Sequence, residues 1–232
     1  MTDSADRESG HYLRQIKSFV LRQGRLTAGQ QRAFETGWSR LGVDYAPQLL
    51  DFESLYGNTH PVILEIGFGN GDSLAEMADS NPELNYLGVE VHRPGVGHLL
   101  MEIQKRRLQN LRIISHDAID VLRHMLPEHS LSGVQLFFPD PWHKKRHHKR
   151  RIVQQSFLDE LSRVLVTGGF FHAATDWENY AEHITTGLNC NPHFSLVDAD
   201  PYAARRPGTK FEQRGMRLGH RVTDIAALNR VA

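Results

Sequence analysis

The feature that most constrains the fold is a repeated alternation of short apolar runs with helical segments, which begins at Pro61. Five apolar runs are each followed by a segment of helical periodicity: PVILEIG, NYLGVEV, LRIISHDA, SGVQLFFPDP and GFFHAATD. Strands joined by helices in this way run parallel, with the helices on both faces of the sheet. Two late runs, FSLVD and MRLGHRV, have no strong helix between them and predict an antiparallel edge. The sequence therefore predicts an α/β fold with a mostly parallel sheet.

The length and composition indicate one α/β domain with a full core. We expect residues 46–232 to form this single domain and residues 1–45 to form a basic, partly flexible N-terminal arm. Four glycines interrupt the arm and argue against a long helix there: Gly24, Gly29, Gly37 and Gly42. The first residues lack the apolar stretch of a signal peptide, and no apolar run approaches the ~18 residues of a membrane span. With one cysteine, Cys190, a cytoplasmic protein without an internal disulfide is expected.

The charge is unevenly distributed along a chain whose formal net charge is +0. Basic residues gather in three segments, residues 11–40, 143–151 and 201–219, whereas acidic residues gather in the middle of the chain. Separated basic islands on a neutral protein indicate an anionic partner that meets one face only.

Three glycines follow the first buried run and predict a tight turn where a ligand approaches the backbone. The pattern is E-x-G-x-G-x-G, formed by Glu65, Gly67, Gly69 and Gly71. The dinucleotide fingerprint G-x-G-x-x-G needs a glycine at position 72, where this chain has Asp72. An acid at that helix start would repel a pyrophosphate. The spacing therefore favours a cationic, phosphate-free ligand such as S-adenosylmethionine.

Acidic residues also stand at the ends of the later strands, where ligands bind in parallel α/β sheets. Glu90 ends the second strand and is placed to accept hydrogen bonds from a ribose diol. Asp117, followed by Ala118, ends the third strand, where a carboxylate beside a backbone N–H suits adenine. Asp140 and Asp176 follow the fourth and fifth strands. Together these positions predict a site for S-adenosylmethionine.

The fourth strand runs into a turn, Pro139-Asp140-Pro141-Trp142, and then into a strongly basic block. We expect its six cations to contact RNA phosphates: Lys144, Lys145, Arg146, Lys149, Arg150 and Arg151. Six such contacts predict a log–log salt slope of binding near about −5. Trp142 either stacks on a base or anchors the loop. His143, His147 and His148 lie among positive charges without a companion cysteine, so no metal site is expected.

Five stretches together resemble the bacterial tRNA (guanine-N7)-methyltransferase family: ILEIGFGNG, GVEVHRPG, HDA, FFPDPWHKKRHHKRRI and TKFE. The similarity extends over roughly residues 15–220. It implies the class I S-adenosylmethionine-dependent methyltransferase fold, a Rossmann-like sheet of seven strands in the order 3-2-1-4-5-7-6. It also implies methylation of guanine 46 in the tRNA variable loop.

The resemblance also implies roles for individual residues. The family's cofactor acids correspond to Glu65, Glu90, Asp117 and Asp140. Its substrate contacts correspond to Lys144, Asp176, Thr209, Lys210, Phe211 and Glu212. Whether Lys144 touches the guanine or its phosphate stays open.

The chemistry of guanine N7 requires little from the protein beyond alignment. N7 carries an in-plane lone pair and no proton, so no general base is needed for an in-line displacement at the methyl carbon. Positive charge moves onto the purine, and a fixed carboxylate would stabilise it. Asp140 is the candidate catalytic residue, with Asp176 across the pocket.

Two other functions fit parts of the pattern. One is a methyltransferase that acts on another RNA or on a small molecule, although no lid or substrate domain is visible and the basic islands would lack a purpose. The other is a non-catalytic RNA-binding protein, against which the intact set of acids argues. The tRNA species used stay open, as does the choice between a monomer and a homodimer.

Overall fold

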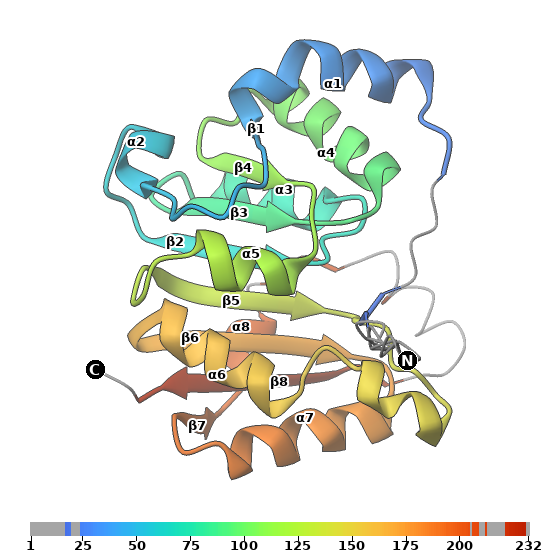
Figure 1. The fold of residues 1–232 in the computed structure, drawn as a ribbon, viewed down its shortest axis with the longest axis vertical. Coiled ribbons are helices and arrows are strands. Elements are labelled where there is room, and N and C mark those ends of the chain that lie inside the picture. Colours follow the sequence, from blue (N-terminus) through green and yellow to red (C-terminus); the bar gives the residue numbers. More distant parts are fainter. Residues whose placement is uncertain (1–16, 20–23, 205, 209–211, 213–220, 231–232) are drawn as a thin grey trace, which may run out of the picture.

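The computed structural model describes residues 17–19, 24–204, 206–208, 212 and 221–230 (Figure 1). These residues form an eight-stranded sheet with the order β1-β4-β3-β2-β5-β6-β8-β7. The strands are β1 (Gly42–Val43), β2 (Val62–Ile66), β3 (Asn85–Val89), β4 (Leu111–Ile114), β5 (Leu131–Phe137), β6 (Leu165–Thr175), β7 (Phe194–Val197) and β8 (Thr223–Asn229). Strands β1 to β6 pair in parallel, and β8 runs antiparallel to both β6 and β7.

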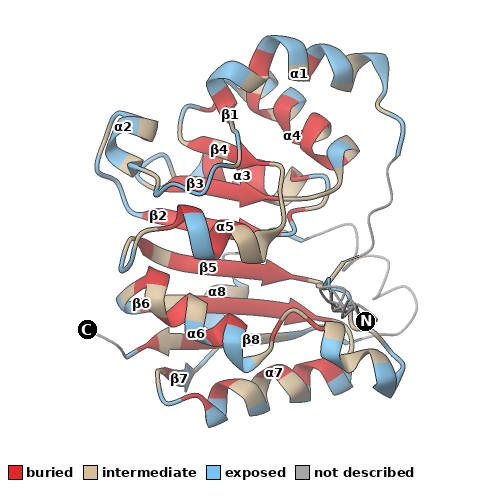
Figure 2. Cartoon of the chain, in the orientation of Figure 1, coloured by how far each residue is buried: buried red, intermediate tan, exposed pale blue. Residues whose placement is uncertain are grey.

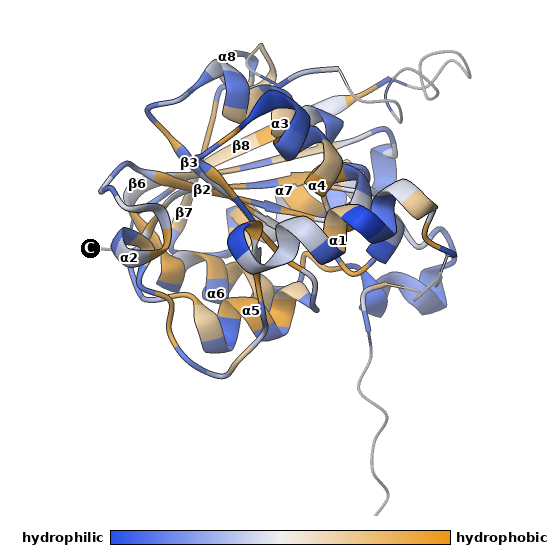
Figure 3. Cartoon of the chain, turned by 90° about the horizontal axis from the view of Figure 1, so that it is seen from above, coloured by the Kyte–Doolittle hydropathy of each residue, from blue (hydrophilic) through white to orange (hydrophobic). Residues whose placement is uncertain are grey.

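Helices cover both faces of this sheet. They are α1 (Ala28–Leu41), α2 (Phe52–Tyr56), α3 (Asp72–Ser80), α4 (Arg93–Arg106), α5 (Ala118–Met125), α6 (Gln155–Val164), α7 (Glu178–Cys190) and α8 (Asp200–Ala203), with a 3-10 helix η1 (Lys145–Arg150). One core cluster joins the sheet to α1, α3 and α4, and another joins it to α5, α6 and α7. Figure 3 shows α3 and α8 on one side of the strands and α5 and α6 on the other. No helix in the described parts of the chain is long and apolar enough to cross a membrane.

The burial pattern follows from this layering. The central strands β2 to β5 are mostly buried, while the outer faces of the helices are exposed (Figure 2). All five residues of β2 and all five of β3 are buried, as expected for parallel strands covered on both faces. In α6, Phe157, Leu158 and Leu161 face the core at helical spacing.

The predicted fold class is confirmed. Without the two-residue strand β1, the sheet has seven strands in the expected order 3-2-1-4-5-7-6. The additional strand arises because Gly42 and Val43 pair with Ile113 and Ile114 of β4.

The expectation that glycines exclude a long helix from the N-terminal arm is wrong, because Ala28–Leu41 form α1, and Gly42–Val43 then form β1. Thr27 and Gln30 form a capping box that starts α1. Gly37 does not break the helix, because its missing side chain leaves room for α4: a Cβ there would lie 2.5 Å from Gln104 Nε2. Close packing of α1 on α4 thus outweighs the cost of about 1 kcal/mol for a helical glycine. The assignment of residues 46–232 to a single domain stays a prediction.

The last described strand begins later in the chain than expected. It is β8, which follows the predicted run MRLGHRV; residues 216–220 of that run lie outside the described residues, and Arg221 and Val222 precede the strand. Ile225, Ala226 and Ala227 are buried, so β8 is covered on both of its faces there. Helix α6 stops at Val164, and Gly168 and Gly169 lie within β6, where Gly168 has a φ of 74°.

The turn between β2 and α3 is held against the start of α4. Gly67, Gly69 and Gly71 have φ values of 74°, 60° and 76°, a region that side chains rarely adopt. A Cβ on Gly95, in the first turn of α4, would lie 2.0 Å from the carbonyl oxygen of Gly69. The glycine at position 95 therefore allows α4 to press directly on the turn.

Replacing Gly95 by alanine should displace this turn, because the added Cβ meets rigid backbone rather than a movable side chain. We expect Gly95→Ala to lower the free energy of unfolding by about 1–3 kcal/mol, measured by denaturant unfolding. Gly187→Ala in α7 is the matched control, since its Cβ would lie 3.5 Å from Leu158, an ordinary contact. Equal stability of the two variants would contradict this account of the turn.

Candidate active site

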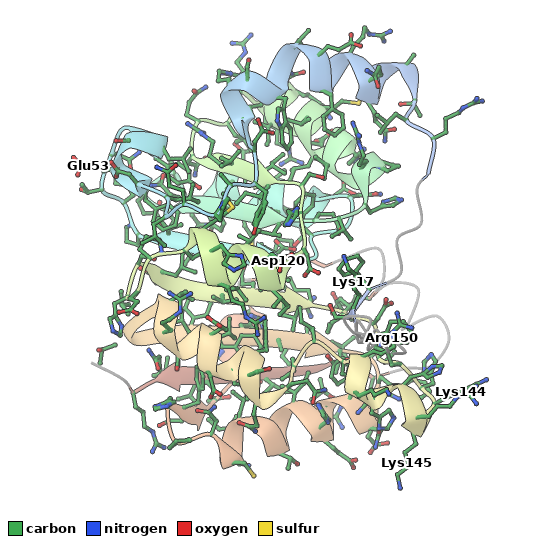
Figure 4. All side chains as sticks on the ribbon, in the orientation of Figure 1. Lys17, Glu53, Asp120, Lys144, Lys145 and Arg150 are labelled. Atoms are coloured by element: carbon green, nitrogen blue, oxygen red, sulfur yellow. The ribbon has the colours of Figure 1, made fainter. Side chains whose placement is uncertain are left out.

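The expected site residues gather at the edge of the sheet where the parallel strands end. Glu65 lies within β2 and Glu90 directly after β3; Asp117 follows β4, Asp140 follows β5 and Asp176 follows β6. Figure 4 shows Lys17, Arg150, Lys144 and Lys145 on this side of the molecule, with Glu53 on the opposite side. One edge therefore carries both the acidic strand ends and the basic block, as the sequence predicts.

Glu65 carries a buried carboxyl group. It is 3% exposed, and its Oε2 has no hydrogen-bond partner among the described residues. Burial, and secondly the negative charge of Glu90, raise the pKa of Glu65 to about 8. A cation bound at the turn would both pair with this oxygen and stabilise its ionised form.

Glu90 closes the glycine turn. Its Oε2 accepts a hydrogen bond from the N–H of Gly69 at 2.9 Å. Its Oε1 accepts from the N–H groups of Val91 and His92 at 2.7 and 2.9 Å. A carboxylate accepts about four hydrogen bonds, so these three leave room for a ribose hydroxyl. Glu90 thus holds the glycine turn in place and keeps the capacity to accept from a ribose hydroxyl, as the sequence predicts.

Asp117 and Ala118 lie side by side at the start of α5. Asp117 is the N-cap of the helix, and its side chain accepts from the N–H of Ile119 at 3.1 Å. This bond fixes the carboxylate beside the first amides of the helix. A Cβ on Gly67 or Gly69 would meet no described atom within 4 Å, so the described part of the chain leaves that side of the turn open. The unpaired buried oxygen, the open turn and the fixed carboxylates fit S-adenosylmethionine.

The turn that carries Asp140 is bracketed by two residues in an unusual backbone conformation. Phe138 and Trp142 have φ values of 51° and 48°, which are uncommon for residues other than glycine. The N–H of Phe138 donates to the carbonyl of Ala174 in β6 at 2.8 Å. Asp140 itself is exposed. Backbone strain of this kind clusters at functional sites and needs support from the surrounding structure.

Arg151 supplies part of that support and is not a surface cation. It is 2% exposed, and its Nε donates to the carbonyl oxygen of Pro141 at 2.9 Å. Its Nη2 donates to Asn179 Oδ1 at 2.8 Å, and the guanidinium lies 4.8 Å from the ring of Tyr180. The expectation that Arg151 contacts phosphate is therefore corrected: it holds the Asp140 turn against α7.

The rest of the basic block divides by exposure. Its four exposed cations are Lys144, Lys145, Arg146 and Lys149. Arg150 is half-buried: its guanidinium lies 3.9 Å from the ring of Trp142, and its Nε donates to the carbonyl of Lys17 at 3.1 Å. Trp142 Nε1 donates to the carbonyl of Ser18 at 3.0 Å, so the indole anchors the N-terminal segment here.

The three histidines of the block have separate partners. The His143 ring lies 4.1 Å from that of Trp177, the His147 ring lies 6.0 Å from that of Trp142, and His148 Nε2 bonds to Arg151. The described residues hold no group of three or more histidine, cysteine or acidic side chains that could bind a metal ion. The expectation of no metal site stays a prediction. Desolvation, and then the surrounding arginines and lysines, lower the pKa of His147.

Asp176 lines a cavity of about 990 Å³ beside the end of β6. The cavity wall includes Trp177, Asp200, Arg221 and Asp224. Since Phe137 and Ala174 are paired in neighbouring strands, the Asp140 turn and Asp176 follow adjacent strand ends. The alternating sequence pattern predicts that the Asp140 turn and Asp176 lie close together, but it does not predict the cavity.

Of the TKFE segment, Thr209, Lys210 and Phe211 lie outside the described residues. Glu212 is described, and Arg206 donates to both of its carboxylate oxygens, at 2.8 and 3.0 Å. Sequence reasoning missed Arg206 and Asp224 as residues near the site. One signal could have indicated Arg206: it stands six residues before Glu212 in the third basic segment.

The sheet order, the glycine turn and the acidic strand ends define a class I methyltransferase. A family model described as putative methyltransferase matches residues 59–225. The tRNA (guanine-N(7)-)-methyltransferase of Vibrio cholerae is 55% identical over 223 residues, 94% of this chain and 93% of that protein. The protein of the same name from Shewanella amazonensis is 53% identical over 229 residues, 97% of this chain and 96% of that one. The chain belongs to the tRNA (guanine-N7)-methyltransferase family.

Solved structures with the same fold are more distant in sequence. The 16S rRNA methyltransferase KamB matches with a TM-score of 0.58 at 14% identity, covering 79% of this chain and 95% of that one. The aminoglycoside resistance methyltransferase NpmB1 matches with a TM-score of 0.55 at 14% identity, covering 78% and 94%. These similarities concern the fold alone.

The raised pKa of Glu65 predicts a pH-dependent stability. Between its ordinary value of 4.5 and about 8, the folded protein keeps a proton that the unfolded chain releases, so stability falls as pH rises through this window. Glu65→Gln should therefore be more stable than the parent at pH 8.5, by at least about 1 kcal/mol or about 2–4 °C in Tm. It should also bind S-adenosylmethionine more weakly.

Thermal unfolding at pH 5.5 and pH 8.5, with calorimetric titration of S-adenosylmethionine, measures both effects. Glu76→Gln, at an exposed position of α3, is the control and should keep the pH dependence of the parent. A Glu65→Gln variant with an unchanged pH dependence would refute the role of the buried carboxyl.

Proposed function

We propose that this protein transfers the methyl group of S-adenosylmethionine to N7 of guanine 46 in the variable loop of tRNA. The observation that carries the proposal is that buried and clamped carboxyl groups and a group of exposed cations lie at the same edge of the sheet. The buried carboxyl of Glu65 and the clamp of Glu90 form a receptor for a cationic cofactor. Directly after the Asp140 turn, four exposed cations face outward. The names of relatives at 52–55% identity support the same substrate.

The reaction asks the protein for alignment rather than proton transfer. S-adenosylmethionine, when bound, supplies an electrophilic methyl group on a positively charged sulfur. Guanine N7 presents its lone pair without losing a proton, so no general base is required. The contribution of the chain is to hold the base in line and to stabilise the positive charge that develops on the purine.

Asp140 is the candidate catalytic residue because its carboxylate is exposed on a turn whose backbone is fixed. The left-handed conformations of Phe138 and Trp142 and the bond from Arg151 to Pro141 hold that turn. A preoriented carboxylate needs little reorganisation as the purine becomes cationic. Asp176, in the neighbouring cavity, would face the base from the next strand end.

The tRNA backbone would meet the exposed part of the basic block. The proposed phosphate contacts are Lys144, Lys145, Arg146 and Lys149. Arg150 would join them if its bond to the carbonyl of Lys17 opened. Thr209, Lys210, Phe211 and Glu212 remain proposed substrate contacts. A cytoplasmic location is part of the proposal because the substrate is tRNA.

Comparing the nucleosides of tRNA from cells with and without the gene tests the function. We expect 7-methylguanosine at position 46 to disappear when the gene is deleted and to return when it is restored. Loss of a modified nucleoside from ribosomal RNA instead would favour another RNA substrate and sink the proposal.

Removing the charge of Asp140 should slow methyl transfer without preventing tRNA binding. We expect Asp140→Asn to lower kcat by about 100-fold or more, the scale on which a single preoriented electrostatic group acts. Single-turnover methylation, with filter binding of tRNA, separates the two effects. Asp79→Asn, an exposed position on α3, is the control. Near-normal turnover by Asp140→Asn would remove Asp140 from the mechanism.

Salt dependence tests the exposed part of the basic block. Replacing Lys144, Lys145, Arg146 and Lys149 by alanine should make the log–log salt slope of tRNA binding shallower by about 2.8–3.6, at about 0.7–0.9 per phosphate contact. Lys105→Ala, near the end of α4, should leave the slope unchanged. An unchanged slope in the fourfold variant would show that these side chains do not meet phosphate.

A further inference from the structure

A buried arginine stands between two carboxylates beside the Asp140 turn. The Arg206 side chain is 4% exposed. Its Nη1 and Nη2 donate to the two oxygens of Glu212 at 2.8 and 3.0 Å. Its Nε and Nη2 donate to the two oxygens of Asp224 at 3.1 and 3.3 Å. The guanidinium thus makes a fork with each carboxylate, a geometry that lysine cannot reproduce.

The network is anchored in the sheet. Asp224 lies in β8 and bonds through Oδ1 to Nε2 of His172 in β6 at 2.7 Å, where the His172 side chain is 1% exposed. Burial alone would raise the pKa of Asp224, but the bonds from His172 and Arg206 outweigh it and hold this pKa below its ordinary value. Asp224 is therefore ionised at neutral pH and gives Arg206 a fixed negative partner.

Arg206 also contacts the strand that leads to the reaction edge. Its guanidinium lies 5.6 Å from the centre of the Phe137 ring and 5.5 Å from that of Phe138, within the range of cation–π attraction. Phe138 is the residue in left-handed conformation that starts the Asp140 turn. The Arg206 side chain therefore links Asp224 in the sheet, Phe138 at the start of the Asp140 turn, and Glu212.

We infer that Arg206 is a positioning residue for methyl transfer, which fixes the Glu212 carboxylate relative to the Asp140 turn. The inference rests on the proposed function, in which Glu212 contacts the substrate. Glu212 precedes β8 in the chain, and its two bonds from Arg206 link it to β8 because Arg206 also donates to Asp224 of that strand. A change of donor geometry at Arg206 would then misplace the substrate base while the cofactor residues on β2, β3 and β4 stay in place.

The test is Arg206→Lys, which keeps the positive charge and loses the fork. We expect kcat for tRNA methylation to fall at least tenfold, while the Kd for S-adenosylmethionine stays within about twofold. Arg163→Lys is the control, since Arg163 also bonds to a carboxylate, that of Glu160, and lies in the last turn of α6, away from the Asp140 turn. It should leave kcat unchanged.

A second comparison separates positioning from general structural support. If Arg206 acts through Glu212, adding Arg206→Lys to Glu212→Gln should lower kcat by less than about twofold beyond Glu212→Gln alone. Multiplicative losses, or a parallel loss of S-adenosylmethionine affinity, would overturn the inference. Where Arg206→Lys does not fold, Glu212→Asp is the alternative: it keeps the charge, shortens the reach to Arg206, and should lower kcat with unchanged cofactor affinity.

The proposed function and the inference fail in different ways. If the parent protein does not methylate tRNA, the proposed function is wrong and the inference falls with it. If the parent methylates tRNA and Arg206→Lys does so at the same rate, the inference alone is wrong.

Discussion

The site depends on the closure of one turn by one carboxylate. Glu90, at the end of β3, accepts hydrogen bonds from Gly69, Val91 and His92, and so ties the glycine turn of β2 to the neighbouring strand. Gly95 lets α4 press on the carbonyl of Gly69 from the other side. With the turn fixed, the carboxyl of Glu65 stays buried, and its Oε2 has no partner within the part of the chain that the structure describes. Burying this carboxyl group without a partner costs free energy in the free protein, and the binding of a cation offsets that cost.

Charge is arranged in layers around the edge of the sheet. Carboxylates at the strand ends face the proposed position of a cationic cofactor and of the purine that becomes cationic. Four exposed cations follow the Asp140 turn and are the proposed contacts for tRNA phosphates: Lys144, Lys145, Arg146 and Lys149. Two arginines with buried side chains support the flanks of this turn: Arg151 bonds to Pro141, and Arg206 packs on Phe138. The basic residues of this site therefore divide into proposed RNA contacts and supports for the turn.

Much of this architecture could be predicted from local pattern, and the rest could not for physical reasons. The five strand–helix units and the acids at their ends follow from periodicity and spacing, which the sequence displays directly. Gly37 looked like a helix breaker because its role, close packing of α1 on α4, depends on a residue far along the chain. Arg151 looked like its exposed neighbours because a run of cations carries no sign of which one turns inward. The pairing of Arg206 with Glu212 and Asp224 likewise exists only after the sheet has formed.

The most direct test of the account uses the purified protein, S-adenosylmethionine with a labelled methyl group, and an unmodified tRNA transcript. After incubation the tRNA is digested, and the labelled nucleoside is identified and placed in the sequence. The account predicts labelled 7-methylguanosine at position 46 of the variable loop, and no label when that guanine is replaced by another base. Label at another nitrogen of guanine, or on another base, would contradict the account.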